Sequence, residues 1–291
     1  MSDKLKNFIV RTLSGAVLLL VILGAMWVGF LGYLALLFFI TVLGVREFYS
    51  LAKAKGYEPQ RGLGLTLAIM VYLVGALAGL GFEYQVSDYL LLAVYPVGIS
   101  IVPLIGLIFF VEVFRNRTTP IANVATTLAG VIYVAFPMAL MPGLALMLTP
   151  NGQQWSALYF LFYLFLVWGN DVFAYLAGVT MGRHKMCERL SPKKSWEGFA
   201  GGVLGSLAVG ALAAYLLEQS YGIWIGLALI VSLTSVVGDL VESMFKRDAG
   251  VKDSGSIMPG HGGILDRFDA FILAAPFAFI YMLLVVLDKC L

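Results

Sequence analysis

Charged side chains suited to phosphate and metal chemistry gather in one stretch, residues 243–269, between two long apolar runs. The stretch reads SMFKRDAGVKDSGSIMPGHGGILDRFD and holds four basic residues, four carboxylates and one of the two histidines. Its glycines and proline disfavour a continuous helix. Carboxylate oxygens suit Mg²⁺, and Lys and Arg suit phosphate oxygens. The sequence predicts a phosphate-handling loop, with an ordinary polar connection between helices as the alternative.

Three more carboxylates, Asp171, Asp239 and Glu242, lie inside apolar runs, where each costs roughly 2.5 to 3.5 kcal/mol to insert in a membrane. Helical periodicity places a set of polar residues on one face: Ser232, Ser235, Asp239, Glu242, Ser243 and Lys246. Such a stripe predicts a water-filled funnel. Gly238, beside Asp239, predicts a close approach of another helix or of a ligand. Salt bridges from Asp239 and Glu242 to neighbouring bases remain an alternative, and Asp171 could instead hold two helices together.

The loop offers further groups for both kinds of ligand. Its carboxylates are Asp248, Asp253, Asp266 and Asp269, of which the last two are spaced to share a helix face. Its bases, with two lysines of an earlier basic loop, could neutralise a nucleoside triphosphate or a lipid phosphate: Lys193, Lys194, Lys246, Arg247, Lys252 and Arg267. His261 lies in PGHGG, where glycines let backbone amides approach phosphate. A solvent-exposed histidine in a turn explains that motif equally well.

The composition determines which elements must position these groups. With 60% hydrophobic and 12% charged residues, the chain has too little polar surface for a soluble globule of this size. Its apolar runs are about 20 residues or longer, which suits membrane-spanning helices better than strands. Cys187 and Cys290 are too few and too far apart for a disulfide framework or a metal cluster. We expect an all-α, polytopic membrane protein.

The sequence predicts nine membrane spans, and we expect the first of them to be a span and not a cleavable signal. The predicted spans are Leu13–Gly29, Leu31–Val45, Gly62–Leu80, Tyr89–Val113, Ile121–Leu148, Trp155–Met181, Phe199–Leu217, Ile223–Phe245 and Ile264–Leu287. Of the 19 Lys and Arg, 18 then fall at the N-terminus or in the even-numbered loops, with Arg267 counted in the loop 243–269, which overlaps the ninth span, and only Lys289 falls outside. This asymmetry predicts a cytoplasmic N-terminus and a cytoplasmic loop 243–269. We expect an N-terminal region, 1–118, and a catalytic region, 119–291.

The loop closely resembles the signature of phosphatidate cytidylyltransferases, the CDP-diacylglycerol synthases, in the string S-M-F-K-R-x4-K-D-S-G-x2-M-P-G-H-G-G-I-L-D-R-F-D. The resemblance continues through GDLVES, SPKKSWEGFAGG and LVWGNDVFAYLAG and covers roughly the C-terminal half. The chain departs from the family's usual pattern in two small ways, at Met258 and in the SPKKSWEG form, and neither departure removes a charged group. The signature is long, and chance matches to it are few.

The resemblance implies that the protein transfers CMP from CTP to phosphatidic acid at the cytoplasmic side of a bacterial inner membrane. It implies that Asp239 and Asp266 bind Mg²⁺, with K⁺ as a second cation, and that the protein is a homodimer among membrane lipids, with no nucleic-acid partner. The implied catalytic side chains are Asp239, Asp266, Lys246, Arg247, Arg267, Ser243 and Asp171. The implied substrate-binding residues are Lys193, Lys194, Ser195, Lys252, Asp253, His261, Gly262 and Gly263.

Two other functions fit part of this pattern. A cation-coupled transporter also uses intramembrane carboxylates, but it needs polar groups through to the far side, where these spans carry no charge. A different CTP-dependent membrane enzyme, such as a polyprenol kinase, is closer. Labelled CTP distinguishes these possibilities by which phosphate group is transferred.

Overall fold

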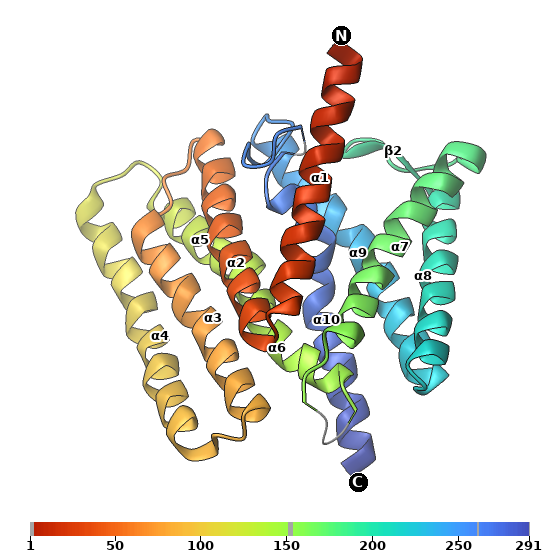
Figure 1. Ribbon diagram of the computed structural model, residues 1–291. Helices are drawn as coiled ribbons and strands as arrows, with labels where there is room; N and C mark the ends of the chain where they lie inside the picture. Colours follow the sequence, from red (N-terminus) through yellow and green to blue (C-terminus); the bar gives the residue numbers. More distant parts are fainter. Residues whose placement is uncertain (1–2, 151–153, 261, 291) are drawn as a thin grey trace. The chain divides into compact units, whose positions relative to one another are not determined.

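The computed structural model describes residues 3–150, 154–260 and 262–290, which are mainly helical (Figure 1). Nine helical spans within these ranges are long and apolar enough to cross a membrane, which confirms the all-α, polytopic prediction. The helices are α1 Asp3–Trp27, α2 Phe30–Ala54, α3 Arg61–Glu83, α4 Ser87–Arg115, α5 Pro120–Gly130, π-helix η1 Val131–Ala135, α6 Phe136–Leu148, α7 Ala157–Met181, α8 Trp196–Leu216, α9 Tyr221–Asp248 and α10 Leu265–Cys290. The orientation across the membrane stays a prediction.

The chain forms two compact units, each discontinuous in sequence. The first unit comprises Met1–Gly143 and Phe245–Phe268, and the second comprises Leu144–Met244 and Asp269–Leu291. In the first unit α3 packs against α2 and α4, and η1 packs against α2, α3 and α5. Three buried tyrosines of this unit, Tyr33, Tyr49 and Tyr72, donate hydrogen bonds to backbone carbonyls of neighbouring helices. These bonds satisfy hydroxyl groups that would be costly to bury alone.

Helix α2 is longer than the sequence predicted. The predicted second span ends at Val45, followed by a polar segment to Arg61, but the helix continues to Ala54. No helix-breaking residue occurs between Val45 and Gly56. Gly56 adopts φ 99°, just after the end of α2. Glu47, in the added turns, is only 5% exposed. A residue assigned to a polar connection is therefore part of the protein interior.

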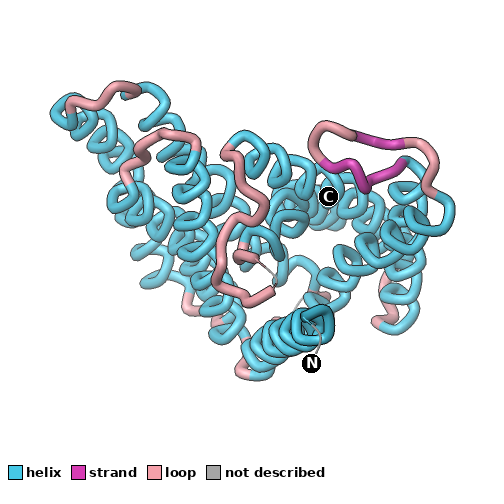
Figure 2. The backbone as a smooth tube through the Cα atoms, turned by 90° about the horizontal axis from the view of Figure 1, so that it is seen from above, coloured by secondary structure: helices cyan, strands magenta, loops and turns pink. Residues whose placement is uncertain are grey.

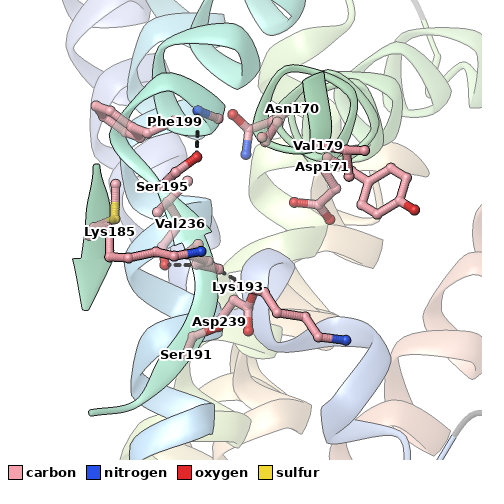
Figure 3. A pocket seen from close by; sticks show the side chains of 16 residues that line it. Asn170, Asp171, Val179, Lys185, Ser191, Lys193, Ser195, Phe199, Val236 and Asp239 are labelled. Atoms are coloured by element: carbon pink, nitrogen blue, oxygen red, sulfur yellow. Dashed lines mark hydrogen bonds and ion pairs between the residues drawn. The ribbon is translucent and has the colours of Figure 1, made fainter. Parts of the chain in front are cut away.

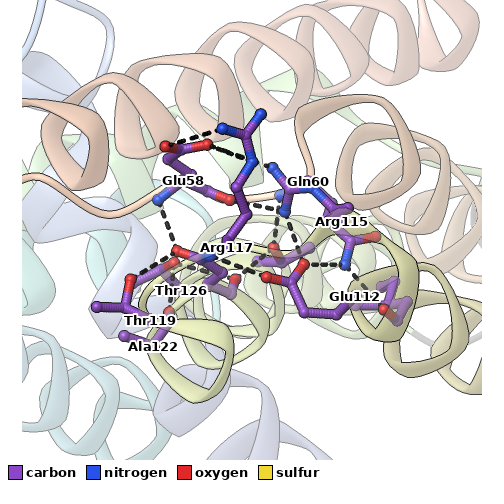
Figure 4. Close-up of polar contacts among 11 residues, drawn as sticks. Glu58, Gln60, Glu112, Arg115, Arg117, Thr119, Ala122 and Thr126 are labelled. Atoms are coloured by element: carbon purple, nitrogen blue, oxygen red, sulfur yellow. Dashed lines mark hydrogen bonds and ion pairs between the residues drawn. The ribbon is translucent and has the colours of Figure 1, made fainter.

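A buried polar cluster joins α4 and α5 to the segment before α3 (Figure 4). The Glu112 carboxylate accepts hydrogen bonds from Gln60 Nε2 at 2.7 Å, Arg115 at 2.7 Å and Asn123 Nδ2 at 2.8 Å. Arg115 also donates to the carbonyl of Glu58 at 2.9 Å. Because both carboxylate oxygens accept bonds, the cluster can tolerate a charge that is 6% exposed.

The second unit contains a short β-hairpin where the sequence predicted a basic loop. Strands β1 Lys185–Cys187 and β2 Ser191–Ser195 pair antiparallel and connect α7 to α8 (Figure 2). Helices α7 and α8 lie side by side, with β2 against both. Ser195 ends the hairpin and caps α8, because its Oγ accepts a hydrogen bond from Gly198 N at 3.1 Å. The hairpin thus carries Lys193 and Lys194 on an ordered strand.

Candidate active site

A pocket of about 480 Å³ in the second unit gathers several of the predicted site residues (Figure 3). Four elements form its wall: α7, the β-hairpin, the first turn of α8 and α9. Its volume lies within the range of about 300 to 1,000 Å³ typical of small-molecule sites. The polar residues that line it are Asn170, Asp171, Lys185, Ser191, Lys193, Lys194, Ser195 and Asp239.

An ion pair joins the hairpin to α9 inside this pocket. Lys194 Nζ lies 2.7 Å from Asp239 Oδ2 and also donates to the carbonyl of Val236 at 3.3 Å. Both side chains are partly exposed, at 22% for Lys194 and 39% for Asp239. The sequence left open a pair between Asp239 and a base of the 243–269 loop, and the described pair is with Lys194. Asp239 therefore faces the pocket and is paired there with a lysine of the hairpin.

Asn170 and Asp171 are neighbours in the chain with different surroundings. Asp171 is exposed and lines the pocket, whereas Asn170 is completely buried. Asn170 lies against α8, where a Cβ at Gly202 would come within 2.7 Å of its Oδ1. Neither amide atom of Asn170 has a hydrogen-bond partner among the described residues. Asn170 thus lies between α7 and α8, and the role of Asp171 stays a prediction.

A group of three carboxylates adjoins the pocket on its α9 side. Asp239, Glu242 and Asp269 each offer an oxygen, and these oxygens lie within 4.8 Å of one another. Glu242 is 1% and Asp269 is 9% exposed. Like charges this close repel strongly where little water screens them, so a bound divalent cation would offset the repulsion. The three hard oxygen donors fit such an ion.

Gly238 explains how α10 comes close enough to complete this group. A Cβ at residue 238 would lie 2.6 Å from the carbonyl oxygen of Asp269. The sequence predicted a close approach at this glycine, and the structure confirms it. Further along the same helix Ser232 and Ser235 are fully buried. The polar stripe is therefore packed at those positions and reaches the pocket at Asp239.

In the first unit, the Asp266 carboxylate organises the loop 243–269. The ends of this stretch are helical in the structure, because α9 continues to Asp248 and α10 begins at Leu265. Its Oδ1 lies 2.7 Å from Lys246 Nζ. Its Oδ2 accepts bonds from Ser254 N and Ser254 Oγ, both at 2.9 Å, and from Gly263 N at 2.7 Å. The prediction that Asp266 binds a cation stays open, and Asp266 has a structural role besides.

The remaining predicted residues fall into four groups. Ser243 Oγ lies 3.5 Å from Asp239 Oδ1, in the second unit. Gly262 adopts φ 84°, and the Gly263 amide is already used by Asp266. His261 lies outside the described residues. The other charged positions of the loop are exposed: Arg247, Lys252, Asp253 and Arg267.

Comparison with known proteins identifies the chemistry that such a site performs. A family model described as the cytidylyltransferase family matches residues 9–285. This chain belongs to that family. It is 34% identical to a phosphatidate cytidylyltransferase of Synechocystis sp. over 275 residues, which cover 86% of this chain and 88% of the relative. A Staphylococcus epidermidis relative of the same name is 32% identical over 92% of this chain and 96% of its own length.

A shorter stretch of this cytidylyltransferase is more similar to some other relatives. A phosphatidate cytidylyltransferase of Staphylococcus aureus is 51% identical over 124 residues, or 42% of this chain. Because the chain belongs to the cytidylyltransferase family, it is a nucleotidyltransferase, as the sequence predicted.

Sequence reasoning assigned no role to three residues that the structure places in or beside these clusters. Lys185 and Asn170 line the pocket, and Glu47 contacts the loop. Lys185 carried a signal, because it lies in the same basic segment as Lys193. Asn170 is distinguished in the sequence only by its position next to Asp171. Glu47 carried no signal, since an acidic residue next to Arg46 at a helix end is typical of a solvated connection.

Proposed function

We propose that this cytidylyltransferase transfers CMP from CTP to phosphatidate and releases pyrophosphate. The observation that carries the proposal is the pocket in which Lys194 pairs with Asp239 beside two further carboxylates. The pocket combines lysines that can bind phosphate with carboxylate oxygens that can bind a metal ion. The names of the relatives and the signature of loop 243–269 support the same reaction.

The reaction needs no nucleophile from the protein. An oxygen of the phosphatidate phosphate attacks the α-phosphorus of CTP and forms a new P–O bond. The bond from that phosphorus to the bridging oxygen of the β-phosphate breaks, and pyrophosphate leaves with those electrons. Catalysis then depends on alignment of the two phosphates and on neutralisation of charge in the transition state. We assign these tasks to the lysines and carboxylates of the pocket in the second unit and to the charged residues around Asp266 in the first unit.

The residues divide this work by their chemistry. Lys193 and Lys194 of the hairpin bind phosphate oxygens, as do Lys246, Arg247 and Arg267 of the loop. Asp239 would hold a divalent cation with Glu242 and Asp269, and Asp266 of the first unit remains a proposed metal ligand. A bound Mg²⁺ would polarise the phosphate oxygens of CTP, and K⁺ is the proposed second cation. Asp171, Ser195, Ser243, Lys252, Asp253, His261 and the amides of Gly262 and Gly263 remain proposed site residues.

The setting of the reaction belongs to the same proposal. The distribution of Lys and Arg supports a site on the cytoplasmic side of a bacterial inner membrane. CTP would arrive there from water and phosphatidate from the bilayer. A homodimer and a division into an N-terminal region, 1–118, and a catalytic region, 119–291, remain proposals.

The full-length protein, purified in detergent, should convert phosphatidate and CTP labelled at the α-phosphate into a labelled lipid and pyrophosphate. Removing divalent cations with EDTA should abolish turnover, and added Mg²⁺ should restore it. Transfer of the γ-phosphate to a lipid would identify a kinase instead. Absence of both products from a folded, monodisperse sample would contradict the proposal.

Lys193 and Lys194 should affect catalysis differently, although they are adjacent. Lys193→Gln should raise the KM for CTP by about tenfold, the scale of one charge-assisted hydrogen bond, with kcat little changed. Lys194→Gln should also lower kcat, because it removes the partner of Asp239. Steady-state kinetics with varied CTP test both effects. Lys55→Gln removes a lysine paired with Asp248 at 2.7 Å and serves as the control. Unchanged kinetics in both hairpin variants would show that these lysines contribute only to topology.

A further inference from the structure

Glu47 of α2 is a buried carboxylate that the reaction described above does not use. It is 5% exposed and belongs to the part of the chain that carries no signature motif. Its side chain contacts the loop 243–269, more than 200 residues away in sequence. Oε1 accepts a hydrogen bond from Ile264 N at 3.0 Å, and Oε2 accepts one from Leu265 N at 2.9 Å.

These two amides lie at the start of α10, which begins at Leu265. The first N–H groups of a helix have no partner within the helix, and the helix dipole favours negative charge there. A carboxylate from α2 thus takes the place of a local N-cap residue. Glu47 therefore fixes the point at which the loop becomes α10.

The shape of the loop matches this carboxylate closely. A Cβ at Gly255 or at Gly263 would overlap the carboxylate group of Glu47. Both glycines belong to the signature, and both are explained by the approach of Glu47 to the loop backbone. Arg11 of α1 holds another point of the loop, since its Nε donates to the carbonyl of Gly260 at 2.8 Å.

A short series of contacts links Glu47 to the charged residues of the site. Ser254 Oγ lies 3.3 Å from Glu47 Oε2 and 2.9 Å from Asp266 Oδ2. A hydroxyl has one proton, so Ser254 donates to the nearer carboxylate while lying between the two. Asp266 in turn binds Lys246 at 2.7 Å. A shift of Glu47 would therefore move the position of Asp266.

We infer that Glu47 is a positioning residue: it holds Asp266 and Lys246 in their reactive geometry by fixing the loop 243–269 from the N-terminal part of the chain. The inference rests on the proposed function for its kinetic consequence. Its structural consequence, an ordered loop, can be measured without any activity. Glu47 itself touches neither substrate in this account.

The chemistry of the contact predicts which substitutions fail. Gln has nearly the same shape, but its NH₂ group would face a backbone N–H at Ile264 or Leu265. Two donors would then oppose each other in a buried place, where a lost hydrogen bond is costly. Asp keeps two accepting oxygens but is shorter by one methylene. We therefore expect Glu47→Gln to disturb the loop more than Glu47→Asp.

The test compares Glu47→Gln with Glu112→Gln in the full-length protein. Glu112 is a matched control: it is 6% exposed, is in the same unit, and accepts bonds from Gln60, Arg115 and Asn123. Both variants should lower the melting temperature. Only Glu47→Gln should lower kcat per folded molecule, by about tenfold or more, because small displacements of catalytic groups cost that much. Glu47→Asp should recover part of this loss, and the KM for CTP should change less than kcat.

Limited trypsin digestion gives the second readout, since Lys252 is exposed in the loop. Glu47→Gln should speed cleavage after Lys252, and Glu112→Gln should leave it at the wild-type rate. Equal cleavage rates in all three proteins, or equal kcat losses in the two Gln variants, would overturn the inference. If Glu47→Gln does not fold, the same comparison is made with Glu47→Asp. If the wild type does not transfer cytidylyl groups but Glu47→Gln is still cleaved faster than the wild type, the inference is kept and only the proposed reaction is rejected.

Discussion

Asp239→Asn should reduce the rate of cytidylyl transfer by about a hundredfold to a thousandfold, the scale seen when one preorganised electrostatic contact is removed from an active site. Asp239 lines the pocket, pairs with Lys194 at 2.7 Å and belongs to the three-carboxylate group. An amide keeps the shape of the side chain but removes its charge. The substitution thus weakens cation binding and releases Lys194, while the packing of α9 is retained.

Cation titration separates these two consequences. Asp239→Asn should need a higher Mg²⁺ or Mn²⁺ concentration for thermal stabilisation than the wild type, because the group keeps only two carboxylates. Asp248→Asn is the matched control, since Asp248 lies on the same helix, is 58% exposed and pairs with Lys55. The control should keep near-normal kinetics and cation response. Near-normal turnover in folded Asp239→Asn would rule out Asp239 as a ligand.

Asp266→Asn should cause a second large loss, of at least about a hundredfold in kcat. Asp266 is 5% exposed and accepts bonds from Lys246, Ser254 and Gly263. An NH₂ group cannot accept any of these bonds, and Lys246 would lose its carboxylate partner. Removing one partner of a buried ion pair costs about 3 to 5 kcal/mol in other proteins. The loop should therefore lose both its charge balance and its order.

Two roles of Asp266 can be distinguished by measurement. If Asp266 only organises the loop, Asp266→Asn should speed tryptic cleavage after Lys252 and leave the cation response unchanged. If it is also a ligand, the cation concentration needed for stabilisation should rise as well. Glu58→Gln is the control, because Glu58 is a carboxylate of the same unit that pairs with Arg117 at 3.0 Å. Full activity of Asp266→Asn would contradict both roles.

The N-terminal part of the chain gains a function from these contacts beyond anchoring. Arg11 and Glu47 hold the signature loop at Gly260 and at the start of α10. The polar cluster around Glu112 holds the ends of α4 and α5 in the same unit. Helices without any recognisable motif can therefore determine how well the motif works.

Several features follow from the sequence alone because their causes are local. The lengths of the apolar runs determine the nine spans, since each must cross a hydrocarbon layer of about 30 Å. Periodicity places Asp239 and Glu242 on one helix face, and Gly238 predicts a close helix approach. The signature string identifies the family, because so long a match rarely arises by chance.

Other features depend on which distant segments meet, and local pattern cannot supply that. Asp239 joins Asp269 because α10 packs at Gly238, and it joins Lys194 because the segment after α7 folds as a hairpin. Glu47 resembles a surface residue in the sequence, yet it caps a helix 218 residues away. Burial makes Glu47 a specific partner, because a charge shielded from water requires hydrogen-bond donors or a cation. The sequence determined the membrane fold and the charges available, and only tertiary packing decided which of those charges meet.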